Sequence, residues 1–133
     1  MKGLHLYPIG FVSNGREEMA APESFAETES TLHFVGLPPG VLDGLEPGQD
    51  ILVLFWFHRR QGYSPKVHPK GDPRRPLRGV FATCAPQRPN PIGATRCRLI
   101  EVGPASLRVR GLDALDGTPL LDIKPFAMGE GNA

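Results

Sequence analysis

The sequence has few cysteines, no long apolar run and no sustained helical pattern. Its 133 residues include only two cysteines, Cys84 and Cys97, which lack the close spacing of a metal-binding pair, and we expect no disulfide between them. No stretch approaches the roughly 18 apolar residues of a membrane helix, and the N-terminus lacks the apolar stretch of a signal peptide. We therefore expect one cytoplasmic domain over residues 1–133, with no membrane partner.

Several common catalytic motifs are also missing. No glycine-rich nucleotide fingerprint follows a strand, and there is no P-loop, no Gly-x-Ser-x-Gly elbow and no His-Glu-x-x-His. The four histidines are scattered without the spacing of metal ligands, so no metal is expected.

Charge is distributed unevenly along the chain. Residues 1–57 hold two basic and eight acidic residues, whereas residues 58–98 hold ten basic residues and the single acid Asp72. Such a segment favours an anionic partner, with RNA the natural candidate, although a phosphorylated metabolite or a merely solvated surface fits the charge as well. The residues predicted to contact RNA are Arg60, Tyr63, Lys66, Lys70, Arg74, Arg75 and Arg78.

Strand-like segments separated by proline and glycine predict a mostly β protein with six to eight strands. The run at 50–57 is apolar without alternation, which indicates a strand buried on both faces. The other expected elements are strands at 5–12, 32–35, 78–83, 94–102, 105–112 and 120–123, a helical turn at 41–45, long loops at 13–31 and 59–77, and a flexible tail at 127–133.

Two groups of charges need partners. Four arginines, at positions 96, 98, 108 and 110, alternate with apolar residues and share one face, which calls for acidic neighbours, an anionic ligand or solvent. Asp122 and Lys124 interrupt an apolar strand and need each other or a polar ligand, because unpaired buried charge is costly.

The segment from Pro86 to Gly93 is a stiff, proline-rich loop that carries Gln87, Arg88 and Asn90. Polar groups on a stiff loop need little ordering when a ligand binds, so the loop suits a binding site. A plain rigid turn between two strands is the alternative.

Three motifs carry a resemblance to a known family. RGVFAT at 78–83, RPNPIG at 88–93, and DGTP at 116–119 followed by DIKP at 122–125 resemble the TsaA-like (TrmO) family. The resemblance implies a small single-sheeted β-barrel with one or two short helical turns that binds S-adenosylmethionine (SAM) as a homodimer. The implied reaction is N6-methylation of threonylcarbamoyladenosine beside the anticodon of a tRNA. The sequence departs from the family at Cys84 and Ala85, where Arg-Ser is usual, and at Glu23 and Ser24, where Arg and Gln are usual.

The resemblance also implies the cofactor contacts, and the chemistry of the residues indicates candidates for the base. His58, Asp116 and Asp122 are the candidates for the proton-accepting base, and sequence does not separate them. The implied cofactor contacts are Pro22, Glu23, Ser24, His58, Arg59, Cys84, Arg88, Asn90, Pro91, Ala94, Asp116, Gly117, Thr118, Pro119, Asp122 and Lys124. Two other functions stay open, namely a non-catalytic SAM- or RNA-binding module and a methyltransferase with a different substrate.

Overall fold

The computed structural model describes residues 2–18, 20, 22–60 and 62–126. Within these ranges the chain forms eight strands and three short 3-10 turns, which confirms a mostly β protein. The strands are β1 (Gly10–Ser13), β2 (Glu29–Phe34), β3 (Asp50–Trp56), β4 (Lys66–Val67), β5 (Arg78–Gly79), β6 (Ile92–Val102), β7 (Ser106–Arg110) and β8 (Pro119–Pro125). The turns are η1 (Pro22–Phe25), η2 (Pro69–Gly71) and η3 (Val80–Ala82).

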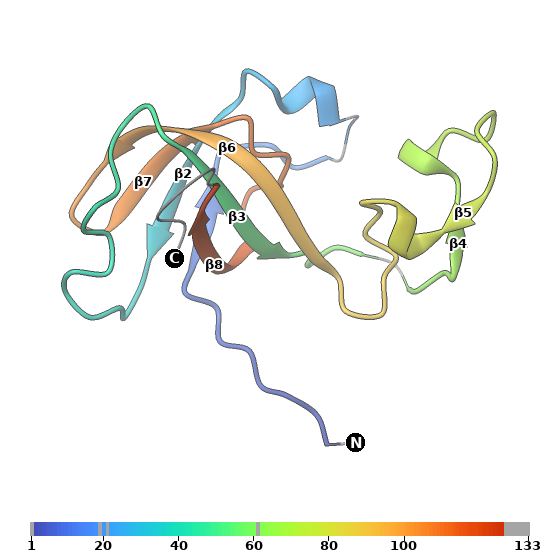
Figure 1. Ribbon diagram of the computed structural model, residues 1–133, viewed down its shortest axis with the longest axis horizontal. Helices are drawn as coiled ribbons and strands as arrows, with labels where there is room; N and C mark the ends of the chain where they lie inside the picture. The colour runs from blue at the N-terminus through green and yellow to red at the C-terminus, as the bar shows by residue number, and fades with distance from the viewer. Residues whose placement is uncertain (1, 19, 21, 61, 127–133) are drawn as a thin grey trace.

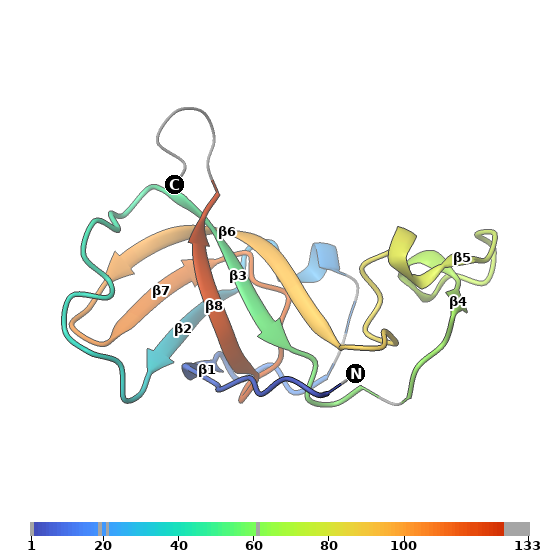
Figure 2. The ribbon, with the colours of Figure 1, turned by 60° about the horizontal axis from the view of Figure 1, so that its bottom comes forward.

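Six strands close into an antiparallel barrel in the order β1-β2-β7-β6-β3-β8, with β8 pairing back to β1. The resemblance predicted this barrel, and the closed topology confirms it. Closure leaves no strand of the barrel with an unpaired edge. The remaining strands, β4 and β5, form a two-stranded ribbon that projects to one side of the barrel (Figures 1 and 2).

The barrel interior holds the hydrophobic core. Along β3, Ile51, Val53 and Phe55 are buried while the alternate residues are only partly covered. The prediction that this strand is buried on both faces was wrong, because a closed barrel has one interior and the outer side of each strand faces away from it. The core residues are Val12, Leu32, Phe34, Ile51, Val53, Phe55, Cys97, Leu99, Leu107, Val109, Leu112, Ala114 and Leu120.

Several predicted boundaries also differ from the structure. The expected helical turn at 41–45 is a series of non-helical turns, and the strand expected at 78–83 ends after two residues, where η3 begins. The loop at 13–31 contains η1 and the start of β2, and the loop at 59–77 contains β4 and η2. The strand expected at 5–12 is displaced to 10–13, and the predicted tail at 127–133 lies outside the described residues.

The four outward arginines are paired with acids of the same chain. Asp50 accepts hydrogen bonds from Arg96 and, at 2.6 Å, from Arg98. Glu29 accepts one from Arg110 at 2.8 Å and lies near Arg108. The arginine hydrogen bonds lower the pKa of both carboxyls. The face therefore needs neither a partner subunit nor an anionic ligand for charge balance.

Residues 58–91 leave the barrel after β3 and return at the start of β6, and we call this segment the insertion. Its two ends are held together, since the Phe57 N–H donates to the Pro91 carbonyl at 2.8 Å and Arg60 donates to the Arg88 carbonyl. Within the described part of the chain, no helix has the length and apolar character needed to cross a bilayer.

Candidate functional site

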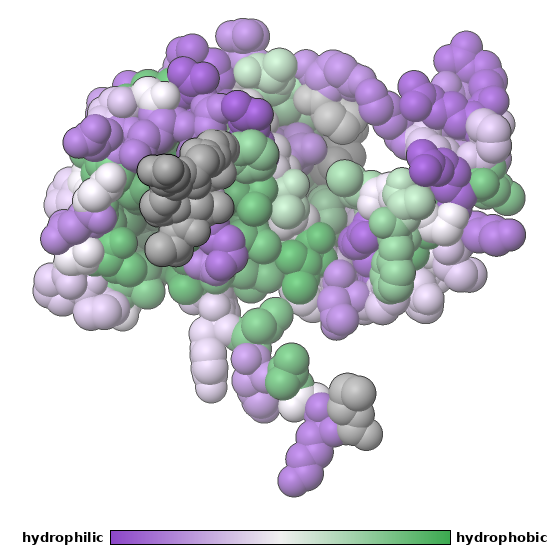
Figure 3. Space-filling model, viewed as in Figure 1, coloured by the Kyte–Doolittle hydropathy of each residue, from purple (hydrophilic) through white to green (hydrophobic). Residues whose placement is uncertain are grey.

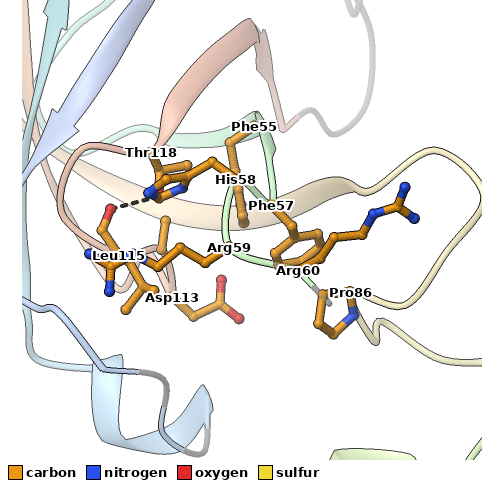
Figure 4. Close-up of a pocket in the computed structure, with 10 residues that line it drawn as sticks. Phe55, Phe57, His58, Arg59, Arg60, Pro86, Asp113, Leu115 and Thr118 are labelled. Atoms are coloured by element: carbon orange, nitrogen blue, oxygen red, sulfur yellow. Dashed lines mark hydrogen bonds between the residues drawn. The ribbon is translucent and has the colours of Figure 1, made fainter. Parts of the chain in front are cut away.

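A cavity of about 50 Å³ lies where β3 ends, between the barrel and the insertion. Figure 4 shows the side chains that surround it. They come from the end of β3, from the start and the proline turn of the insertion, and from the loop before β8. The lining residues are Phe55, Phe57, His58, Arg59, Arg60, Pro86, Asp113, Ala114, Leu115 and Thr118.

Aromatic rings form the inner wall. Phe55 and Phe57 meet edge to face, with ring centroids 5.2 Å apart. Phe55 pairs in register with Gly93 on β6, and a Cβ atom at Gly93 would lie 2.3 Å from the tip of the Phe55 ring. A glycine at this point of β6 is therefore what allows the ring to fill the barrel and close the pocket from within.

His58 lies at the mouth of the pocket, with its Nδ1 atom 3.4 Å from the Thr118 hydroxyl oxygen. That hydroxyl donates its single hydrogen to the Leu115 carbonyl at 2.6 Å, so the His58 Nδ1 is the donor in its contact with Thr118. The free lone pair then belongs to His58 Nε2. Burial against the pocket wall, and then the charge of Arg59, lower the pKa of His58 below its ordinary 6.5, so the ring is neutral at neutral pH.

The loop before β8 is held by a segment from the other end of the chain. Asp116 accepts the backbone N–H groups of Asn14 at 2.8 Å and of Gly15 at 3.1 Å, and these bonds lower the pKa of its carboxyl. The Asn14 side chain donates to the Ala114 carbonyl at 2.9 Å. The turn predicted at Asp116-Gly117 is confirmed, since Gly117 takes a φ of 80°, which glycine adopts readily.

The remaining charged side chains of the pocket point in different directions. Figure 4 shows Arg59 and Arg60 leaving the chain on opposite sides, with the Asp113 carboxylate between them. Arg59 donates to the Glu17 carbonyl at 2.6 Å, and one oxygen of Asp113 accepts the hydroxyl of Thr95. The rim of this apolar pocket thus carries an imidazole, two guanidinium groups and a carboxylate.

The proline-rich loop is organised by Arg88. Its guanidinium Nη1 donates to the carbonyls of Val80, Thr83 and Ala85 at 3.2, 2.7 and 3.2 Å, so it closes the turn from η3 to Pro86. Cys84 lies within this turn and is exposed, outside the pocket lining. Asn90 is exposed, and Pro91 is buried at the start of β6.

Another group of predicted cofactor residues lies on the outer surface of the barrel. Ala94 and Asp122 both pair in register with Leu54, and Lys124 follows on the same face of β8. The prediction that Asp122 and Lys124 lie in a buried strand was wrong, because both side chains are more than half exposed and pair with each other at 3.6 Å.

The 3-10 turn η1 meets the insertion through one ion pair. Lys70 Nζ lies 2.5 Å from a Glu23 carboxylate oxygen, and this hydrogen bond lowers the pKa of Glu23. The neighbouring Ser24 hydroxyl accepts from Arg16 at 3.1 Å. Pro22 begins the same turn.

Of the predicted site residues, the structure brings His58, Arg59, Arg60 and Thr118 together at the pocket. Gly117 and Pro119 flank Thr118 in the same loop and on β8. Among the lining residues that were not predicted, Asp113 lies three positions before Asp116, the first residue of the DGTP motif, and that nearness was the available signal. The aromatic and apolar members gave no signal, because such residues are the usual content of a core. Across the described ranges, no cluster of three or more His, Cys, Asp or Glu side chains has the arrangement of a metal site.

Comparison with known proteins adds independent findings. A family model described as "tRNA-methyltransferase O N-terminal domain" matches residues 15–129. A protein of Methanothermobacter thermautotrophicus, named a probable S-adenosyl-L-methionine-binding protein, is 42% identical over 126 residues, which cover 92% of this chain and 90% of the relative. A tRNA (adenine(37)-N6)-methyltransferase of Mus musculus is 42% identical over 93 residues, which cover 67% of this chain and 21% of the mouse protein.

A solved structure agrees at the level of the fold. The crystal structure of TrmO from Pseudomonas aeruginosa matches with a TM-score of 0.74 at 34% identity. The match covers 95% of this chain and 57% of the solved chain, so the present chain spans little more than half of that protein's length.

Proposed function

The chain belongs to the tRNA-methyltransferase O N-terminal domain family, and on that premise we propose that it binds SAM and methylates a tRNA. The proposed reaction is N6-methylation of threonylcarbamoyladenosine beside the anticodon. The observation that carries the proposal is the pocket at the end of β3, where a neutral histidine on an apolar wall meets the loop of the DGTP motif.

The chemistry of the pocket suits the part of SAM that carries the positive charge. Apolar and aromatic walls with a few polar groups at the rim are typical of sites for amphipathic ligands. His58, Arg59, Asp113 and Thr118 would hold the cofactor there, and the Asp113 carboxylate would face its positive charge. When bound, SAM supplies an activated methyl group on a sulfonium sulfur.

The size of the pocket supports a homodimer. About 50 Å³ is well below the roughly 300–1,000 Å³ of complete small-molecule sites. Ala94, Asp122 and Lys124, the other predicted cofactor residues, lie outside the barrel around Leu54. We propose that a second copy covers this face and completes the cofactor site. Light scattering should then give a dimer mass, whereas a monomer that binds SAM with full affinity would refute this arrangement.

His58 is the proposed base among the three candidates. The Asp116 carboxylate already accepts two backbone N–H groups, and its lowered pKa makes it a weak proton acceptor. Asp122 lies on the outer face beside Lys124. His58 is neutral, and Thr118 orients its ring so that Nε2 offers a free lone pair. His58 Nε2 would take the proton that the N6 nitrogen loses as it is methylated.

The insertion supplies the proposed tRNA contacts. Among the described residues, Lys66 and Arg78 form no ion pair, and Tyr63 is exposed in the same insertion. Arg74 and Arg75 share Asp72, and Lys70 is paired with Glu23, so phosphates would compete with these carboxylates. We expect tRNA affinity to fall steeply as salt concentration rises.

The test has two separable parts. Calorimetric titration of the purified protein with SAM measures cofactor binding, and absence of binding would remove every SAM-dependent function. Incubation of protein and SAM with tRNA from a strain lacking this methyl group, followed by nucleoside mass spectrometry, measures transfer. Binding without any methylated nucleoside would favour a non-catalytic SAM-binding module. The name of the Methanothermobacter relative supports this alternative function.

A further inference from the structure

Phe81 is an exposed aromatic ring held on a rigid turn. Its side chain is 79% exposed, although the adjacent Val80 is only 4% exposed and anchors η3. The sequence predicted a strand at 78–83, whereas the structure places Phe81 in the turn η3. We propose that Phe81 is a platform on which an unpaired nucleobase of RNA stacks. This inference deepens the proposed function, since it rests on RNA being the substrate.

The turn that carries the ring is closed by several hydrogen bonds. The Thr83 N–H and hydroxyl both donate to the Val80 carbonyl, at 3.1 and 2.8 Å. Arg88 Nη1 bonds the Val80, Thr83 and Ala85 carbonyls on the inner side of the same turn. A ring on such a turn loses little backbone freedom when a base stacks on it, which favours binding.

One cation lies close to the ring, and two more are on neighbouring parts of the insertion. The Arg88 guanidinium carbon lies 5.9 Å from the Phe81 ring centroid. The Val80 N–H donates to the Pro65 carbonyl at 2.9 Å, which brings η3 against the start of β4, where Lys66 is exposed. Arg78 precedes η3 by two residues and is also exposed. Positive charges around an aromatic face are the arrangement that binds single-stranded nucleic acid, because phosphates pair with the cations while bases stack.

Phe81 is not the only exposed apolar side chain of the insertion. Tyr63 and Leu77, which belong to the same insertion, are each 55% exposed. Figure 3 shows hydrophobic surface on the projecting insertion bordered by strongly hydrophilic residues. Isolated exposed hydrophobic residues are ordinary on protein surfaces, whereas an apolar patch with a polar border indicates a binding surface.

Charge favours RNA over a second copy of the chain as the occupant. The insertion holds eight basic residues against the single acid Asp72. In a two-fold contact centred on the insertion this surface would meet its own copy, and two such insertions would repel each other. An RNA loop brings the opposite charge and also the flat rings that fit a phenyl face.

The experiment measures binding of a fluorescein-labelled RNA hairpin with an unpaired loop, and of a fully paired RNA duplex of the same length, by fluorescence anisotropy. The proteins are the full chain and its variants Phe81→Leu, Phe81→Tyr and Phe11→Leu. Leucine keeps an apolar side chain but removes the aromatic face, and tyrosine keeps the face. Phe11 is a control, because it is a 43% exposed aromatic residue on β1, stacked on His33.

We expect Phe81→Leu to weaken hairpin binding by roughly 5- to 100-fold, the effect of losing one base–aromatic stack. Phe81→Tyr and Phe11→Leu should bind the hairpin as the wild type does, and duplex binding should change little in all three variants. Unchanged hairpin affinity in Phe81→Leu, or no hairpin binding by the wild type, would overturn the inference. A change in oligomeric mass caused by Phe81→Leu would overturn it too, since the ring would then pack on protein.

A result against the stacking role of Phe81 can be distinguished from a result against the proposed methyl transfer. If Phe81→Leu loses the hairpin while the wild type transfers no methyl group, the stacking platform stands and the reaction does not. If the wild type methylates tRNA and Phe81→Leu binds the hairpin normally, the reaction stands and the platform does not.

Discussion

Replacing Gly93 by alanine should destabilise the barrel and narrow the pocket through one clash. The new Cβ atom would lie 2.3, 2.4 and 2.9 Å from three ring carbons of Phe55. Carbon atoms in contact are normally about 3.5–4.0 Å apart, so the ring has to move by more than about 1 Å. Phe55 is 2% exposed and packed edge to face on Phe57, which leaves the pocket as the direction in which it can move.

The expected change in the free energy of unfolding of Gly93→Ala is the sum of two opposing effects. Overpacking of a core costs about 1–3 kcal/mol. Gly93 has no positive φ, so alanine fits its backbone and returns about 0.4–1 kcal/mol by restricting the unfolded chain. We expect a net loss of about 1–2 kcal/mol, which lowers Tm by about 3–10 °C in a domain of this size. The displaced ring should also weaken SAM binding.

Thermal and urea unfolding of Gly93→Ala, with SAM titration on the same samples, measures both effects. Gly79→Ala is the matched control, because a Cβ at Gly79 has no heavy atom within 4 Å. Phe55→Leu removes the ring that clashes, so Gly93→Ala should cost less in that background, with a coupling energy of about 0.5–3 kcal/mol. A Gly93→Ala protein as stable as Gly79→Ala, or strict additivity with Phe55→Leu, would show that contact with the Phe55 ring does not limit the residue at position 93.

Two further substitutions test the site. His58→Gln should lower kcat for methyl transfer by about 10²–10⁴-fold. In the wild type the neutral imidazole is the active form, so the initial rate should fall only as pH drops through the His58 pKa, which lies below 6.5. In His58→Gln, initial rates measured against pH should show no such fall on the acid side. Asp116→Ala should lower stability by about 1–2 kcal/mol, because it leaves the Asn14 and Gly15 N–H groups without their acceptor. Folding lowers the pKa of Asp116 below 3.8, so its charge stabilises the folded protein above that pH, and the stabilisation is lost as pH falls through the folded pKa. The stability of Asp116→Ala, measured by urea unfolding, should therefore depend less on pH in the acid range.

Local signals predicted much of the fold. Alternating apolar residues and turn residues indicated β6, β7 and the Asp116-Gly117 turn, since side-chain alternation and glycine's backbone freedom are properties of short segments. The closed barrel came from the resemblance of three motifs. The apolar run at 50–57 misled the prediction of burial, because nothing within the run tells which of its two faces turns to the interior.

The candidate site depended on contacts between distant parts of the chain. Asn14 meets Asp116 across 102 positions, and Asp50 meets Arg96 across 46. The sequence therefore showed an excess of cations and a group of aspartates, but it did not show which of these charged residues form ion pairs in the folded protein. It named His58, Asp116 and Asp122 as equal candidates, and the surroundings that distinguish them come from the folded structure.

Residue types and short spacings were enough to indicate the β-rich composition of the chain, its family resemblance, the basic segment and the stiff proline loop. The folded structure was needed to show that the arginines of the outer face are paired, that Arg88 closes a turn, that His58 faces an apolar pocket and that Phe81 is exposed. Those outcomes depend on strand register and barrel closure, which bring together residues that no local pattern connects.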